Sequence, residues 1–274
     1  MLEKNKIRIL VCGDIHGGLK PLLDVLEKSG YDKEYDKLIF LGDYVDGWSE
    51  SSEVIDFLID IEKQAIHKPI FIKGNHDEWC NQWLHTGQIH PYWLTNGGQA
   101  TKDSYMNTGL LTEESHRKFF RSLHNYYIDD QNRGFVHGGY TSRKGLGHEP
   151  YQGNYYWDRD LWTIVSILHT TKDKPVVSSA NRYQQHKEIF IGHTTTTNWN
   201  CKPHYPEYKH PQQPTLNGKI LIPMNRCNVW NLDTGGGWDG KISIMDIDTK
   251  EFWQSELCST YYPNELGRYK KNIK

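Results

Sequence analysis

Five short polar clusters hold the residues of this chain that are best suited to chemistry, and each follows a run of apolar residues. They read Gly13-Asp14-Ile15-His16-Gly17, Gly42-Asp43-Tyr44-Val45-Asp46-Gly47, Gly74-Asn75-His76-Asp77-Glu78, His137-Gly138-Gly139 and Gly192-His193-Thr194. A single Gly-Asp pair or histidine after a strand is an ordinary turn residue. Five such clusters in succession, each at the end of an expected strand, instead indicate one shared site.

The side chains of these clusters make up a donor set for metal ions. The candidate ligands are three histidines, two aspartates and one asparagine, namely Asp14, His16, Asp43, Asn75, His137 and His193. Mixed carboxylate and imidazole ligands suit Mn²⁺, Fe or Zn²⁺ better than Ca²⁺ or a thiolate-bound metal. The five cysteines are scattered and form no Cys-x-x-Cys pair, which argues against a zinc knuckle or a disulfide framework.

The elements that must position these clusters alternate between strand and helix over the first 75 residues. Short β-branched runs predict strands at residues 7–12, 37–41 and 69–73. Apolar residues at helical spacing predict helices at 18–29 and around 54–65, the first ending at Gly30 and the second capped by Ser49 or Ser51. Strands separated by such helices imply βαβ units, whose strands end at one edge of a sheet, where ligands bind.

The rest of the chain has a less regular pattern. Helices are expected at 76–84, 112–125 and 158–170, and strands at 134–136, 188–191, 228–232, 241–247 and 251–254, the last two as a hairpin. Residues 195–226 turn polar and proline-rich, which predicts a long loop inserted over one face. No internal repeat or low-complexity linker interrupts the chain, so we expect a single domain over residues 1–274.

Length and charge exclude several classes of protein. The chain has 274 residues, with 32 Lys+Arg against 34 Asp+Glu, so its formal net charge is −2. A dedicated nucleic-acid or membrane-surface binder needs a basic excess that is absent here. The mean hydropathy is −0.75, and no apolar run approaches the ~20 residues that span a bilayer. Because a signal-peptide core is also missing near Met1, we expect a cytoplasmic protein.

Taken in order, the five clusters resemble the signature of the calcineurin-like metallophosphoesterases. Within that family the chain is most similar to the phosphoprotein phosphatase branch, which includes bacterial and bacteriophage serine/threonine phosphatases and symmetrical diadenosine tetraphosphatases. The resemblance runs from about residue 7 to 247 and includes Trp157-Asp158-Arg159 and Asp233-Thr234-Gly235. It implies an α/β fold, a layered sandwich of two mixed β-sheets flanked by helices, with metals at the carboxyl ends of the strands.

The resemblance also implies a role for each residue. The first of two divalent ions would take Asp14, His16 and Asp43, and the second would take Asp43, Asn75, His137 and His193, with Asp43 as the bridge. Manganese is the expected metal, with iron, zinc or magnesium as alternatives. Two such ions clamp a phosphoryl group and produce a bridging hydroxide that attacks phosphorus directly. His76 would protonate the leaving group, Asp46 would hold His76, and Arg159 would bind the phosphate.

The chain departs from the family pattern next to Asp46. Where the family usually reads Val-Asp-Arg-Gly, this chain reads Val45-Asp46-Gly47-Trp48, so an arginine that would bind the substrate phosphate is absent. Lys73 supplies a point charge close by, although not a planar fork. Trp48, together with the aromatics of the 195–226 segment, is a candidate platform for a nucleobase or a tyrosine ring. We therefore expect Lys73 and Trp48 to contact the substrate.

These features favour a dinuclear-metal phosphatase that hydrolyses phosphomonoesters, with phosphoserine and phosphothreonine proteins as expected substrates. Gly47 and the aromatics keep open an alternative, a nucleotide hydrolase or phosphodiesterase such as a diadenosine tetraphosphatase. A catalytically silent metal-binding protein is a third interpretation, disfavoured because every expected ligand is present. The expected partners are thus a phosphorylated protein or a small phosphoester, with no nucleic acid and no membrane; the oligomeric state stays open.

Overall fold

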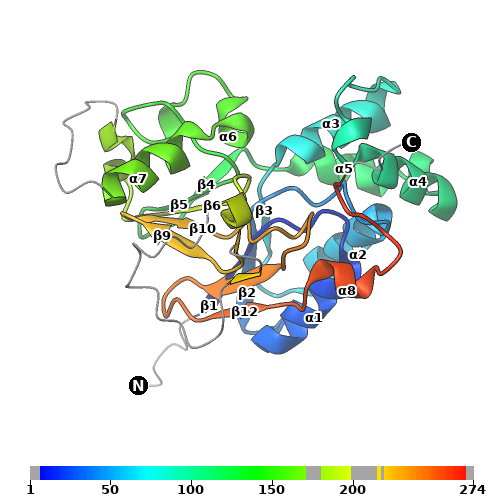
Figure 1. Ribbon diagram of the computed structural model, residues 1–274, viewed down its shortest axis with the longest axis horizontal. Coiled ribbons are helices and arrows are strands. Elements are labelled where there is room, and N and C mark those ends of the chain that lie inside the picture. Colours follow the sequence, from blue (N-terminus) through cyan, green and yellow to red (C-terminus); the bar gives the residue numbers. More distant parts are fainter. Residues whose placement is uncertain (1–6, 171–179, 199–214, 217–218, 270–274) are drawn as a thin grey trace.

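Two β-sheets pack face to face between outer layers of helices in the computed structural model of the chain (Figure 1). The structure describes residues 7–170, 180–198, 215–216 and 219–269. Both sheets combine parallel and antiparallel pairs, so the expected α/β sandwich of two mixed sheets is confirmed.

The first sheet has five strands in the order β12-β11-β1-β2-β3. Their bounds are Arg8–Cys12 for β1, Asp36–Phe40 for β2, Ile70–Phe71 for β3, Ser243–Asp246 for β11 and Phe252–Gln254 for β12. β1, β2 and β3 run parallel, as the βαβ pattern predicts, whereas β11 is antiparallel to β1 and forms a hairpin with β12. The three parallel strands therefore deliver the first three polar clusters to one edge.

The second sheet has the order β4-β5-β6-β10-β9. Its strands are β4 (Tyr126–Ile128), β5 (Arg133–Val136), β6 (Glu188–Ile191), β9 (Met224–Arg226) and β10 (Val229–Asn231). β5, β6 and β10 are parallel, and the two outer strands are antiparallel to their neighbours. The clusters that begin at His137 and Gly192 follow β5 and β6, so they leave the central strands of this sheet.

Apolar side chains of both sheets meet in a buried layer between them. Val11, Ile39, Phe135, Phe190 and Met245 belong to this layer, and none of them is exposed to solvent. The strands are buried on both faces because helices cover the outer faces, which explains their continuous apolar runs. This packing fixes the two sheet edges relative to each other and so sets the spacing of the polar clusters.

The helices of the first sheet arise where apolar residues recur at helical spacing. They are α1 (Leu19–Ser29), α2 (Ser51–Gln64), α3 (Asn75–Thr86) and α5 (Glu114–Ser122). In α1 the buried residues include Leu22, Val25 and Leu26, and the helix ends at Gly30 with a left-handed φ of 62°. The N-cap of α2 is Glu50, without a side-chain cap hydrogen bond, so the expected serine cap is wrong.

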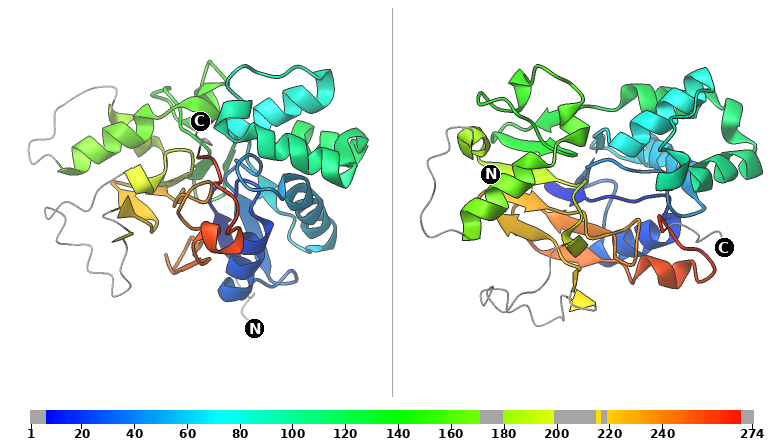
Figure 2. Two further views of the ribbon diagram at one scale, coloured as in Figure 1. Left: turned by 45° about the vertical axis from the view of Figure 1, so that its right-hand side comes forward. Right: turned by 45° about the horizontal axis from the view of Figure 1, so that its top comes forward.

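The outer face of the second sheet is covered by a separate helical layer. It contains α6 (Asn154–Trp157) and α7 (Asp160–Thr170), whose apolar side chains pack with those of β5, β6 and β10. Figure 2 shows this helical layer and the α1–α5 helices on opposite sides of the two sheets. Short 3-10 helices join the larger elements, at Leu94–Asn96, Leu110–Thr112, Leu146–His148, Ala180–Gln185 and Thr196–Asn198.

Several helices and strands outside the 195–226 stretch have no clear counterpart in the sequence pattern. They are α4 (Gly98–Thr108), α6, α8 (Cys258–Tyr261) and β4. The sequence of α4 is polar, and the helix is held instead by tertiary contacts such as the buried side chains of Thr101, Ser104 and Tyr105. A pattern of apolar residues cannot report an element of this kind.

The expectation of a continuous loop at 195–226 is wrong in its described part. β9 pairs with β10 in the second sheet, and two short strands, β7 (Thr215–Leu216) and β8 (Lys219–Ile220), pair with each other. Apolar residues of this stretch, including Ile220, Ile222 and Met224, pack into the buried cluster under α7. Residues 199–214 and 217–218, with the aromatics Trp199, Tyr205 and Tyr208, lie outside the described residues.

None of the helices in the described part of the chain is long and apolar enough to cross a membrane.

Candidate active site

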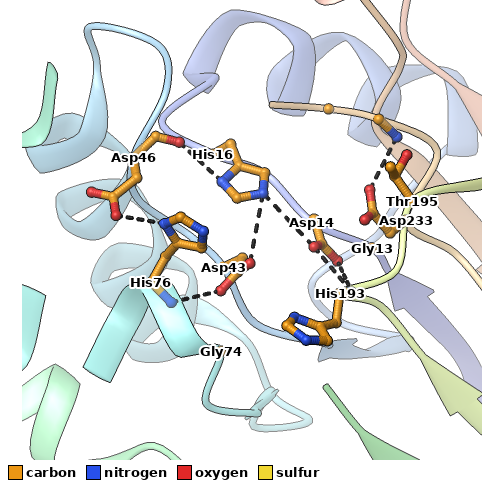
Figure 3. Close-up of polar contacts among 12 residues, drawn as sticks. Gly13, Asp14, His16, Asp43, Asp46, Gly74, His76, His193, Thr195 and Asp233 are labelled. Atoms are coloured by element: carbon orange, nitrogen blue, oxygen red, sulfur yellow. Dashed lines mark hydrogen bonds and ion pairs between the residues drawn. The ribbon is translucent and has the colours of Figure 1, made fainter. Parts of the chain in front are cut away.

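The six expected metal ligands converge at the carboxyl edge of the two sheets. Asp14 and His16 follow β1, Asp43 follows β2, Asn75 opens α3 after β3, and His137 and His193 follow β5 and β6. All six side chains are buried. Figure 3 shows Asp14, His16, Asp43 and His193 around a common centre. Residues separated by up to 179 positions in the chain are thus brought within contact distance.

Asp43 lies between two groups of donor atoms. With Asp14 and His16 it forms one group, and with His137 and His193 a second, the donor atoms within each group lying within 4.8 Å of one another. Oδ2 of Asp43 is 3.6 Å from Nε2 of His16 and 3.3 Å from Nε2 of His137. Atoms that bind one ion at about 2.1 Å each are about 3 to 4 Å apart. The spacing fits two metal positions that share Asp43.

The hydrogen bonds of His16 and His137 direct one ring nitrogen of each toward the centre. Nδ1 of His16 contacts the backbone oxygens of Val45 and Asp46 at 3.1 and 2.9 Å. Nδ1 of His137 contacts the oxygen of Leu41 at 2.8 Å. A carbonyl only accepts, so Nδ1 carries the proton and Nε2 offers its lone pair to the centre. Nε2 of His193 is buried and has no hydrogen-bond partner among the described residues, as expected for a metal ligand.

The electrostatics of the centre also fit a cation. Burial, with the nearby charge of Asp233, raises the pKa of Asp14 well above its usual range. Burial would likewise raise the pKa of Asp43, but the imidazoles of His137 and His76 outweigh it and hold that pKa well below its usual range. Burial lowers the pKa of His137, yet Asp43 raises it to about 9. Buried acids that hold a proton on a neighbouring histidine occupy a place where positive charge is stabilised.

The backbone around the centre adopts conformations that side chains usually avoid. Seven described non-glycine residues have positive φ, and four of them belong to the site: His16 (53°), Asp43 (53°), Asp46 (74°) and His193 (65°). Such strain persists only where surrounding contacts over-determine it, and it concentrates at functional sites. Three of these four residues, His16, Asp43 and His193, are candidate metal ligands.

Asp77 holds the turns that carry Asp43 and Asn75. Its carboxylate accepts hydrogen bonds from the backbone amides of Asp43 (2.8 Å), Tyr44 (2.9 Å) and Gly74 (2.8 Å). A Cβ atom at Gly74 would lie 2.1 Å from Oδ1 of Asp43, so only glycine permits this approach. The third cluster contains Asp77, but its spacing alone did not indicate this supporting role.

His76 and Asp46 form a buried pair beside the centre (Figure 3). Nδ1 of His76 lies 2.6 Å from Oδ2 of Asp46. The same carboxylate accepts hydrogen bonds from Nε1 of Trp93 at 2.7 Å and from Oγ1 of Thr101 at 2.6 Å. The backbone amide of His76 donates to Oδ1 of Asp43 at 3.0 Å. The imidazole is therefore held in one orientation, next to the residue shared by both groups of donors.

Burial shifts the pKa values of His76 and Asp46 in opposite directions. Burial, followed by the charge of Arg268, lowers the pKa of His76 well below its usual range. Burial raises the pKa of Asp46 to about 8, while hydrogen bonds from Thr101 and Trp93 oppose the rise. The lowered pKa of His76 and the raised pKa of Asp46 both oppose the pair of protonated imidazole and ionised carboxylate that is expected from the sequence.

The three expected substrate contacts have different surroundings. Arg159 reaches the centre, because Nη1 donates to the backbone oxygen of His193 at 2.8 Å and to Oγ1 of Thr194 at 3.2 Å. Lys73 is paired with Glu78, at 2.9 Å between Nζ and Oε2. Trp48 is only 1% exposed, and its Nε1 donates to the backbone oxygen of Gly236 at 2.7 Å. The expectation that Trp48 contacts the substrate is corrected: its ring is buried in the core.

Two further charged residues at the centre were not assigned a role from the sequence. Asp233 follows β10, is buried, and raises the pKa of Asp14 through its charge. The tripeptide Asp233-Thr234-Gly235 is part of the family resemblance, so the sequence offered a reason to consider Asp233. Arg268 lies in the C-terminal segment after α8, with Nη1 at 3.3 Å from Nε2 of His16. No motif marks Arg268, so only the tertiary structure identifies it.

An aromatic cleft of about 570 Å³ opens beside the metal ligands. Its lining includes Asn75, Trp79, His90, Tyr92, Tyr156 and Trp157. Trp79 stacks on His90 with ring centroids 5.3 Å apart. The ring centroids of Trp157 and His193 are 6.2 Å apart, in an edge-to-face arrangement. The cleft thus joins the centre to a surface suited to a flat ring.

Comparison with known proteins gives a consistent family assignment. A model of the calcineurin-like phosphoesterase family matches residues 7–222. The chain is 40% identical over 99 residues to serine/threonine-protein phosphatase 2B catalytic subunit A1 of Saccharomyces cerevisiae, covering 33% of this chain and 18% of that relative. It is 23% identical over 299 residues to the symmetrical bis(5'-nucleosyl)-tetraphosphatase of Pseudomonas fluorescens, covering 93% of this chain and 96% of that protein.

Solved structures share the fold at low sequence identity. One described as a putative diadenosine tetraphosphatase aligns with a TM-score of 0.55 at 13% identity, covering 90% of this chain and 92% of that one. A metallophosphoesterase from Sphaerobacter thermophilus aligns with a TM-score of 0.52 at 19% identity, covering 93% and 94%. These alignments bear on the fold alone.

Proposed function

Since this chain belongs to the calcineurin-like phosphoesterase family, we propose that it hydrolyses phosphomonoesters, with phosphoserine and phosphothreonine in proteins as its substrates. The chain is a metal-dependent phosphoester hydrolase. We further propose that the metal is manganese, that the residues named below act in the separate steps, and that residues 1–274 form a single catalytic domain.

The observation that carries the proposal is the arrangement of donors around Asp43. Two groups of buried donor atoms share this one carboxylate, and the tautomers of His16 and His137 direct Nε2 toward it. Asn75 adds a carbonyl-type oxygen, with Oδ1 at 3.2 Å from Nε2 of His137. We assign Asp14, His16 and Asp43 to one metal ion, and Asp43, Asn75, His137 and His193 to the second. Oxygen and imidazole ligands of this kind suit Mn²⁺.

When bound, a pair of divalent ions neutralises the charge on a phosphoryl group and lowers the pKa of a water molecule to near neutrality. The chain itself supplies the proton for the leaving alkoxide. His76 is our candidate acid: its Nδ1 is held by Asp46, so Nε2 is the atom that donates the proton. Asp46 orients the imidazole and stabilises its protonated form.

Arg159 is our candidate for holding the substrate phosphate. Its Nη1 is within hydrogen-bond distance of the residues at the end of β6, and burial lowers the pKa of the guanidinium, while the charges of Asp233 and Asp43 oppose that change. A guanidinium can present two parallel N–H groups to phosphate oxygens. Lys73 is a weaker candidate, because Glu78 already neutralises its charge.

A nucleoside polyphosphate is the second candidate substrate, and the aromatic cleft favours it. The cleft begins at Asn75 and exposes the rings of Tyr92 (69%) and Trp157 (42%). Exposed aromatic faces next to a phosphoryl-binding centre suit a stacked base. The Pseudomonas relative that matches over most of both chains bears the name of a bis(5'-nucleosyl)-tetraphosphatase.

One experiment separates these substrates. The purified protein is loaded with Mn²⁺, its metal content is measured, and p-nitrophenyl phosphate, bis-p-nitrophenyl phosphate, a phosphoserine peptide and diadenosine tetraphosphate are compared by kcat/KM. We expect two metal ions per chain and the highest value for the phosphopeptide. A higher value for diadenosine tetraphosphate would replace the proposal with the second candidate. Two bound ions without turnover of any substrate would refute both.

A further inference from the structure

Gly47 leaves a space beside the centre that another part of the chain fills. Its φ of 128° lies in the region that favours glycine. A Cβ atom at this position would lie 3.1 Å from Cγ of Arg268 and 3.1 Å from the backbone oxygen of His16. A side chain at position 47 would therefore compete with that of Arg268 for the same space. Glycine at position 47, where the family usually has arginine, therefore leaves the space that the side chain of Arg268 occupies.

The guanidinium of Arg268 lies at the edge of the centre, and among the described residues its Nη2 has no hydrogen-bond partner. Nη1 is 3.3 Å from Nε2 of His16, and Nε donates to the backbone oxygen of Asn96 at 3.3 Å. The guanidinium carbon is 4.8 Å from the ring centroid of Trp238, a cation–π distance. Within the described part of the chain, no carboxylate forms an ion pair with Arg268. A half-buried arginine that forms no ion pair with a carboxylate of the described residues is suited to bind an anion.

The segment that carries Arg268 is fixed to the body of the protein. Tyr262 stacks on Trp48, with ring centroids 5.0 Å apart and an interplanar angle of 16°. The carboxylate of Glu265 accepts hydrogen bonds from the amide (3.0 Å) and the hydroxyl (2.7 Å) of Ser49. The amide of Arg268 donates to the backbone oxygen of Gly237 at 2.9 Å. In Figure 1 this segment, drawn in red, leads from α8 back toward the helices α3 to α5.

Gly47 and Trp48, the two residues that depart from the family pattern, both contact the segment that carries Arg268. Gly47 makes room for the side chain of Arg268, and Trp48 provides the surface on which the same segment is anchored. A preorganised arginine loses less conformational entropy on binding than a free one. This explains why Trp48 is buried under the C-terminal segment rather than exposed to a substrate.

We propose that Arg268 binds the phosphate group of the substrate, taking the place of the arginine that is absent at position 47. The proposal rests on the proposed function, because it assigns a further residue to the same phosphoryl-binding centre. Arg159 and Arg268 then approach the phosphate from different segments, the turn before α7 and the segment after α8. Two guanidinium groups favour a dianionic monoester over a monoanionic diester, so Arg268 contributes to substrate specificity.

The test measures binding of inorganic phosphate to the Mn²⁺-loaded protein by isothermal titration calorimetry, so its main readout is independent of turnover. The variants are Arg268→Ala, Arg268→Lys and the matched control Arg121→Ala, whose side chain pairs with Glu114 on the surface of α5. Metal content and thermal unfolding are measured for each variant. The ratio of kcat/KM for p-nitrophenyl phosphate to that for bis-p-nitrophenyl phosphate provides a second readout.

We expect Arg268→Ala to keep its metal ions and to bind phosphate about tenfold more weakly or worse, with Arg268→Lys intermediate and Arg121→Ala unchanged. The monoester-to-diester ratio should fall in the same order. If Arg268→Ala fails to fold, Arg268→Lys alone still has to show the weaker binding.

Three results would overturn the proposal. Unchanged phosphate affinity in Arg268→Ala would show that Arg268 does not bind phosphate, while the proposed function would stand. Tighter metal binding or faster turnover in Arg268→Ala would instead mean that the guanidinium obstructs the centre. If the unmodified protein binds neither metal nor phosphate, the proposed function fails, and the proposal for Arg268 fails with it.

Discussion

Asp43 is the residue on which the centre depends most. It belongs to both groups of donor atoms, its backbone φ is 53°, and its amide is held by Asp77 at 2.8 Å. A carboxylate with two oxygens can serve two ions, whereas an amide offers one oxygen and no charge. Asp43 is therefore the candidate ligand that the two groups share.

We predict that Asp43→Asn lowers the metal content below two ions per chain and reduces kcat/KM by at least about a hundredfold, since even residues that only support a ligand cost 10–100-fold. Metal analysis after gel filtration checks the first effect. Asp103→Asn, an exposed aspartate on α4, is the control. Two ions per chain at a normal rate would exclude Asp43 as the shared ligand.

Substitution of His76 should impair protonation of the leaving group and leave the metal content unchanged. We predict that His76→Ala keeps both ions and loses about 10²–10⁴-fold in kcat for a phosphopeptide. The loss should be smaller for p-nitrophenyl phosphate, because its leaving group needs little protonation. His148→Ala, an exposed histidine, is the control. A phosphopeptide rate equal to that of the unmodified protein would contradict the assignment of His76 as the acid.

At the level of elements, each candidate metal ligand lies in or next to the turn that ends a strand. The β3–α3 turn is the tightest example, because Gly74 approaches Asp43 so closely that a Cβ atom would lie 2.1 Å from its Oδ1. Asp77, in the first turn of α3, holds the amides on both sides of this approach. The turn and the ligand are therefore a single structural unit.

We predict that Gly74→Ala destabilises the protein by about 1–3 kcal/mol, the usual cost of an overpacked site, and weakens metal binding about tenfold. Chemical denaturation and metal titration measure the two effects. Gly147→Ala is the matched control, since its Cβ would meet only the hydroxyl of Tyr126, at 3.5 Å. Stability and metal affinity that match the control would show that the turn can relax.

At the scale of the whole molecule, the centre lies where two sheets meet and concentrates buried charge there. Asp14, Asp43 and Asp233 are all buried near the same point, and burial raises the pKa of Asp233 to about 6. Buried acids without a cation destabilise the folded state. Metal binding should therefore contribute to the stability of both sheets.

We predict that removing metal with a chelator lowers Tm and that Mn²⁺ restores it. At a free metal concentration one hundred times Kd, binding adds about 2.7 kcal/mol, a rise of about 5 to 10 °C for a chain of this size. Scanning calorimetry with chelator and with Mn²⁺ measures the shift, and Asp43→Asn should show a smaller one. Equal Tm values under both conditions would contradict metal binding at the centre.

The sequence by itself determined which strands exist near the centre and which polar residues follow them. Apolar runs ended by glycine predicted β1, β2, β3 and β6, and a shorter run predicted β5; the clusters after these strands contained all six candidate ligands. This works because burial in a sheet requires apolar residues, and because a turn at the end of a strand requires glycine and short polar residues. Such requirements are local and visible in the order of the residues.

Only the tertiary structure decided how distant segments complete the centre. It buried Trp48 under Tyr262, paired Lys73 with Glu78, placed β9 where a loop was expected, and brought Arg268 to His16 across 252 positions. The contacts of Trp48 and Arg268 arise from packing between elements far apart in the chain, and no residue spacing encodes them. The sequence determined the ligands at the ends of strands, and the fold determined which other charges surround them.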